Sequence, residues 1–254
     1  MFFFSPLEQF EILPVISLYL PGFDFSITNE TVSFVLFFSF FYFSFYSSVK
    51  SNDLTLYLIP HRWQYVLEVL YKTVLSIILE NLGELKGQKF FPLLFTTFIF
   101  ILGLNSIGLV PYTFTLTSHL IVTLALSLAL FIGINIVCIS LHSFNFFSLF
   151  FPSGSSVVLG LLLVPIEVIS YIFKPISLSV RLFANMMAGH TLLKVIVGFA
   201  WNLMACSGIL FLISVFPLII LLPLFGLELG VALIQGFVFT ILICIYLNDS
   251  INLH

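Results

Sequence analysis

The feature that most limits what this chain can fold into is a long stretch without charge. Between Phe90 and Ile166 there is no Asp, Glu, Lys or Arg. Hydrophobic residues make up 61% of the chain and charged residues 7%, whereas a water-soluble domain carries about 25% charged residues. So few charges cannot cover a globular surface in water, and lipid must replace water around much of the chain. The composition therefore predicts a membrane protein.

A single membrane domain over residues 1–254 is expected, because each span needs about 20 mostly apolar residues. We expect an all-α fold with about five membrane helices and one amphipathic helix that lies in the interface plane. The expected segments are an N-terminal segment (1–29), a first span (30–49), the interfacial helix (60–88), a helical hairpin (91–140) and two long helices (157–254).

The two last apolar stretches are unusually long. Val157 to Val197 and Ile209 to Leu247 are each about twice as long as a perpendicular span requires. Each must fold back on itself or lie strongly tilted. Because neither has a polar loop at its middle, we expect two long, strongly tilted helices joined around Trp201 to Gly208.

Several other classes of site are not expected. The formal net charge of −3 leaves no basic patch, which excludes nucleic-acid binding. The five histidines lack i, i+4 spacing, so no metal site is expected. No cofactor is expected either. The N-terminus has no basic or Arg-rich run, so it reads as neither a secretory signal nor a transit peptide. The three cysteines stand in apolar runs without CxxC spacing and are expected to be inert, buried thiols (Cys138, Cys206 and Cys244).

The penultimate helix carries polar residues at membrane depth. An ionisable side chain there costs at least about 2.5 kcal/mol, so it is a functional-site hypothesis by default. Arg181 has no carboxylate within one turn, which favours a partner on another subunit over a structural salt bridge to Glu167. At about 100° per residue the polar side chains share one stripe, within about 40° of a line. Its members are Glu167, Ser170, Lys174, Ser177, Arg181 and Asn185.

The last helix carries a second polar face. Glu228 and Gln235 are seven residues apart and share this face. His190 lies opposite the Arg181 stripe, which makes it the natural partner of Glu228. Both this pair and the two amides, Asn185 and Gln235, also have a purely structural interpretation as hydrogen bonds between helices. Small residues would let another helix approach the last one closely (Gly226, Gly230, Ala232 and Gly236).

Four runs of sequence resemble subunit a (subunit 6) of the mitochondrial ATP synthase. They are SPLEQFEI (5–12), LVPYTFTLTSHL (109–120), SLSVRLFANMMAGHTLLK (177–194) and GLELGVALIQGFVFTILICIYLNDSINLH (226–254). The resemblance implies roles for six residues. They are the essential arginine (Arg181), its following asparagine (Asn185), a half-channel pair (His190 and Glu228), a glutamine beside the arginine (Gln235) and an acidic residue toward the exit (Glu167).

The resemblance implies a non-catalytic, proton-conducting stator subunit. Such a subunit forms two half-channels against a c-ring of small proteolipid subunits and couples proton flow to rotation for ATP synthesis. Its other expected partners are stator and peripheral-stalk subunits and membrane lipid. The expected location is the mitochondrial inner membrane, crossed several times. Most basic residues lie between Lys50 and Lys89, so the positive-inside rule places that side and the C-terminus in the matrix and the N-terminus in the intermembrane space.

Two other classes of protein are alternatives. A respiratory proton-pump subunit or a secondary transporter would also place charges inside membrane helices, but a transporter should carry inverted repeats, and none is visible. A purely structural membrane scaffold would not need a lone Arg181 close to Asn185 in an otherwise apolar helix.

Overall fold

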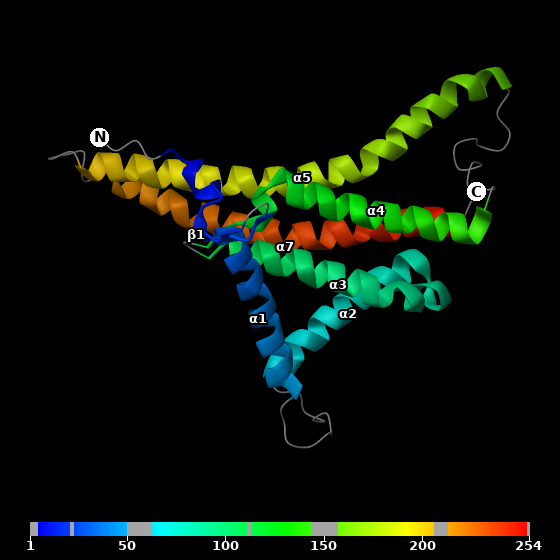
Figure 1. The fold of residues 1–254 in the computed structure, drawn as a ribbon, viewed down its shortest axis with the longest axis horizontal. Coiled ribbons are helices and arrows are strands. Elements are labelled where there is room, and N and C mark those ends of the chain that lie inside the picture. The colour runs from blue at the N-terminus through cyan, green and yellow to red at the C-terminus, as the bar shows by residue number, and fades with distance from the viewer. Residues whose placement is uncertain are drawn as a thin grey trace. The chain divides into compact units, whose positions relative to one another are not determined.

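The computed structural model describes residues 5–20, 23–49, 62–110, 113–143, 157–205 and 213–252. These parts are almost entirely helical (Figure 1), which confirms the predicted all-α class. The long helices are α1 (Asn29–Val49), α2 (Arg62–Leu82), α3 (Glu84–Gly108), α4 (Leu120–His142), α5 (Val157–Ala205) and α7 (Val215–Ile251). Two short 3₁₀ turns accompany them, η1 (Glu8–Phe10) and η2 (Leu116–Ser118).

Four helices in the described residues are long and apolar enough to cross a membrane. These stretches are Lys86–Gly108, Leu120–His142, Leu162–Ala205 and Val215–Ile251. The first span expected from the sequence corresponds to α1, which has 21 residues, and its membrane crossing stays a prediction. The interfacial position of α2 likewise stays a prediction, and residues 50–61 before it lie outside the described part.

The N-terminal segment contains short strands that the sequence did not indicate. Strand β1 (Pro14–Ile16) pairs antiparallel with β4 (Ile27–Thr28), and β2 (Tyr19–Leu20) pairs with β3 (Phe23–Asp24). Asn29 joins these strands to α1, because its Oδ1 accepts from the Leu13 N–H while its Nδ2 donates to the Glu11 carbonyl.

A single glycine separates α2 from α3. Gly83 has φ +74°, a left-handed conformation that side chains with a Cβ rarely adopt. The next helix begins at Glu84, whereas the sequence places the hairpin's first helix from residue 91. The charged residues that precede the apolar run therefore belong to α3, and Gly83 marks the break between α2 and α3.

Helix α5 is continuous over 49 residues and α7 over 37. The alternative in which either stretch folds back on itself is therefore not adopted. The turn expected from Trp201 does not include Trp201–Ala205, because α5 continues to Ala205. The other residues of the expected turn, 206–208, lie outside the described part. At about 1.5 Å per residue, the 49 residues of α5 are more than twice as long as the hydrocarbon layer is thick.

The contacts group the chain into two compact units. The first contains residues 1–66, 100–119 and 183–235, and the second contains residues 67–99, 120–182 and 236–254. An aromatic-rich core stabilises the first unit, with Phe37, Leu104, Phe114 and Leu116 at its centre. Gly103 lies against the ring edges of Phe37 and Phe41 and lets α1 and α3 approach closely.

The second unit has its own apolar core. Helix α2 buries one face at helical spacing through Val74, Ile77, Ile78 and Leu82. The other helices of this unit contribute buried side chains that include Leu94, Phe98, Ile134, Leu178, Phe239, Ile243 and Leu247. Cys138 and Cys244 are free and buried, as expected from their apolar surroundings, and Cys206 lies outside the described residues.

Candidate functional site

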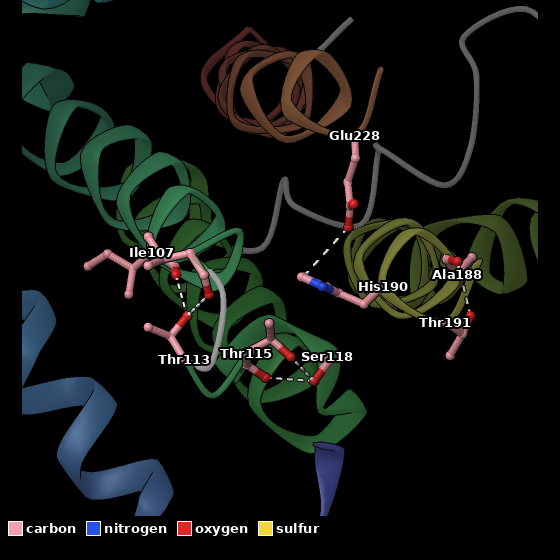
Figure 2. Close-up of polar contacts among 9 residues, drawn as sticks. Ile107, Thr113, Thr115, Ser118, Ala188, His190, Thr191 and Glu228 are labelled. Carbon is pink, nitrogen blue, oxygen red and sulfur yellow. Dashed lines mark hydrogen bonds and ion pairs between the residues drawn. The ribbon is translucent and has the colours of Figure 1, made fainter. Parts of the chain in front are cut away.

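The contact expected between His190 and Glu228 is present within the first unit. Figure 2 shows the two side chains pointing toward one another from α5 and α7, with His190 Nε2 3.6 Å from Glu228 Oε1. This separation is an ion-pair distance and is too long for a direct hydrogen bond. The two groups are therefore close enough to exchange a proton through one water molecule.

Glu228 is buried and His190 is half-buried, and both have side-chain atoms without a hydrogen-bond partner. The side chain of His190 is 15% exposed and that of Glu228 is 6% exposed. Neither the Nε2 of His190 nor either carboxylate oxygen of Glu228 makes a hydrogen bond within the part of the chain that the structure describes. Because buried polar groups are normally hydrogen bonded, the lack of partners at these three atoms calls for a functional explanation.

A glycine makes room for the carboxylate. A Cβ added at Gly189 would lie 2.7 Å from Glu228 Oε1 and 3.0 Å from its carboxyl carbon. Sequence reasoning assigned the close approach to the small residues of α7 instead. Within the described structure, a Cβ added at Gly226 or Gly230 would meet nothing within 4 Å, so the expectation that another helix approaches there stays a prediction. The sequence feature that could have indicated this role for Gly189 is its position directly before His190.

His190 and Glu228 also line a large cavity within the first unit, with a volume of about 980 Å³. Its wall is mainly apolar. The polar side chains on it come from the N-terminal segment, α1, the segment before α4, α5 and α7, and are Gln9, Asn29, Ser33, Thr113, Thr115, His190, Lys194 and Glu228. Thr113 is fixed there because the carbonyls of Ile107 and Val110 share its hydroxyl proton; Figure 2 shows Thr113 beside Ile107.

The two amides predicted from sequence also meet. Asn185 Nδ2 on α5 donates to Gln235 Oε1 on α7 at 2.9 Å. A third amide, which the sequence analysis did not single out, is Asn105 on α3. It is fully buried, and its Nδ2 donates to the Ala232 carbonyl at 3.4 Å. Its only sequence signal is an amide inside a long uncharged apolar run.

Arg181 and Glu167 lie in the second unit. Arg181 is exposed, Glu167 is half-buried, and neither forms an ion pair or side-chain hydrogen bond with the described residues. The structural salt bridge between them is therefore not formed there. Lys174 shares their stripe and forms an ion pair instead, with its Nζ 3.6 Å from Asp249 Oδ2. The sequence did not point to Asp249. No cluster of His, Cys, Asp and Glu that could hold a metal ion occurs among the residues described.

Comparison with known proteins decides the family. The family model of the ATP synthase A chain matches residues 30–248. The chain belongs to this family. It is 55% identical over 252 residues to ATP synthase subunit a of Pylaiella littoralis, a match that covers 99% of this chain and 100% of that protein.

Land-plant members of the subunit a family give the same answer. ATP synthase subunit a-2 of Arabidopsis thaliana is 48% identical over 254 residues, covering 98% of this chain and 72% of that protein. ATP synthase subunit a of Brassica napus is also 48% identical, with 98% and 97% covered. The chain is thus a multi-pass inner-membrane protein and the proton-translocating, non-catalytic stator subunit of the ATP synthase membrane sector. The pump, transporter and scaffold alternatives are set aside.

Proposed function

We propose that His190 and Glu228 form the proton-loading pair at the inner end of an entry half-channel. The observation that carries the proposal is their 3.6 Å contact on the wall of a cavity of about 980 Å³. A cavity that is lined by several polar groups is large enough to admit water. Water in it would hydrogen bond to the carboxylate and imidazole atoms that have no partner in the described structure.

Asn185 and Gln235 guide the proton onward from this pair. Both contribute amide groups from the same two helices, α5 and α7, that carry His190 and Glu228. An amide neither gains nor loses a proton at ordinary pH, so its role is to orient water and neighbouring polar groups.

Arg181 is the fixed cation that separates the two half-channels. A guanidinium keeps its proton in proteins, so its charge repels protons and prevents a direct leak between the aqueous paths. The same charge attracts each deprotonated carboxylate of a c-ring of small proteolipid subunits. The exposure of Arg181, without an ion pair to the described residues, supports a partner on another chain.

The exit half-channel leads past Glu167 toward the matrix. In this arrangement the N-terminus faces the intermembrane space and the C-terminus the matrix of a mitochondrion, and α5 and α7 lie strongly tilted within a single membrane domain. Peripheral-stalk subunits and lipid cover the remaining surface. The membrane potential supplies about 2.3 kcal/mol for each charge per 100 mV, which biases rotation but does not offset a bare, buried ion pair. The contact between Arg181 and the ring is therefore brief and partly hydrated.

The test of the loading pair is an exchange of its members. His190→Glu and Glu228→His singly should each lower proton-driven ATP synthesis at least about tenfold, because each removes one side of the exchange. The double exchange should recover more rate than either single variant retains, at equal amounts of assembled complex. Losses that simply add would show that the two residues act independently.

A further inference from the structure

Lys174 and Asp249 join α5 to the last turns of α7. The Lys174 Nζ lies 3.6 Å from the Asp249 Oδ2, and both residues belong to the second unit. Lys174 stands inside the candidate span Leu162–Ala205, and charged residues within membrane helices normally pair with one another. The ion pair therefore removes net charge from this part of α5.

Two aromatic rings hold the ammonium group in place. The Lys174 Nζ lies 5.4 Å from the ring centroid of Tyr171 and 4.9 Å from that of Tyr246. Tyr171 is itself fixed, since its hydroxyl donates to Asn135 on α4. An exposed ion pair alone contributes little to stability, and the Asp249 side chain is 48% exposed. The faces of both rings attract the cation, which keeps it beside Asp249.

Arg181 follows Lys174 by seven residues on the same continuous helix. Two turns of helix separate them by about 10 Å, on one side of the helix. Two uncompensated cations at that distance would both repel an arriving proton and would compete for the same anionic group. With Asp249 in place, Lys174 is neutralised, while Arg181 has no ion pair among the described residues.

We propose that Asp249 is a positioning residue that neutralises Lys174, so that Arg181 acts as the single effective cation of its stripe. The group that Arg181 attracts is a carboxylate of the c-ring. This inference rests on the role proposed above for Arg181. Asp249 itself need not carry the proton. What matters is that the charges at positions 174 and 249 cancel.

The test is a charge-cancellation cycle in membranes that carry the whole ATP synthase. Asp249→Asn should lower proton-driven ATP synthesis about tenfold, because it leaves Lys174 uncompensated close to Arg181. Lys174→Gln combined with Asp249→Asn should restore the rate to within about threefold of the native enzyme. Lys174→Arg, which keeps the charge and can stack on the tyrosines, should retain most of the rate. Lys89→Gln, on the exposed side of α3, is the matched control for loss of a lysine and should behave as native.

Each rate is divided by the amount of assembled complex, so that a variant that fails to fold is not counted as inactive. If the Asp249→Asn defect persists in the double variant, Asp249 acts by itself and the inference is wrong. A native rate for Asp249→Asn alone would also overturn it. Arg181→Gln, measured in the same membranes, separates failure of the proposed function from failure of this inference. Substantial synthesis by Arg181→Gln contradicts the proposed function. A double variant that is not rescued contradicts only the neutralising role of Asp249.

Discussion

Gly189 of α5 lies directly against the carboxylate of Glu228 on α7, so that a Cβ at position 189 would lie only 2.7 Å from Oε1. Gly189→Ala should therefore push the carboxylate away from His190. We expect at least about a tenfold loss of proton-driven ATP synthesis, since displacing a reacting group by about 1 Å has effects of that order or larger. The measurement is the rate of synthesis per assembled complex in energised membranes.

Gly198→Ala is the matched control for this substitution. It makes the same change on the same helix, but an added Cβ there meets nothing within 4 Å in the described structure. Alanine favours a helix over glycine by about 1 kcal/mol, so this control should be neutral or slightly stabilising. Equal losses for both variants would show that the space beside Glu228 is not what matters.

The hydrogen bond from Asn185 to Gln235 should contribute to the stability of the first unit. Asn185→Ala leaves the buried Gln235 side chain without its hydrogen-bond donor, and an unsatisfied buried group costs about 1–3 kcal/mol. We expect a lower thermal inactivation temperature of the purified complex. Asn202→Ala changes an exposed asparagine of the same helix, and an equal shift for that control would contradict the prediction.

The packing of α1 on α3 depends on Gly103. A Cβ at this position would overlap the rings of Phe37 and Phe41, and overpacking a core costs about 1–3 kcal/mol. Gly103→Ala should therefore reduce the amount of assembled complex. Gly133→Ala on α4, where a Cβ meets nothing within 4 Å in the described part, should leave that amount unchanged. A normal level of the Gly103→Ala complex would show that α1 can move away without penalty.

The polar faces of single helices could be predicted from the sequence. Apolar length predicted the continuous α5, and helical spacing placed His190 away from Arg181. Glu228 could be assigned to His190 because few polar groups exist in these helices, so each has few candidate partners. The amide contact between Asn185 and Gln235 follows from the same scarcity.

The remaining contacts depend on how one helix is rotated against another, which the spacing along a single helix does not specify. Lys174 could have paired with any acidic residue within reach, and its pairing with Asp249 is set by the packing of α5, α7 and the tyrosines. Gly189 gained its role only because α7 places Glu228 against it. The strands near the N-terminus are too short to leave a periodic pattern.

The most direct test of the proposed mechanism is proton-driven ATP synthesis by membranes that carry Arg181→Gln. The substitution removes the charge while keeping a polar side chain, so assembly should be nearly normal. The account predicts that coupled synthesis is abolished, and that Arg181→Lys is also poor, because a desolvated lysine loses its proton more readily than arginine. Near-normal synthesis by Arg181→Gln membranes with a normal content of assembled complex would contradict the central claim that this fixed charge separates the two half-channels.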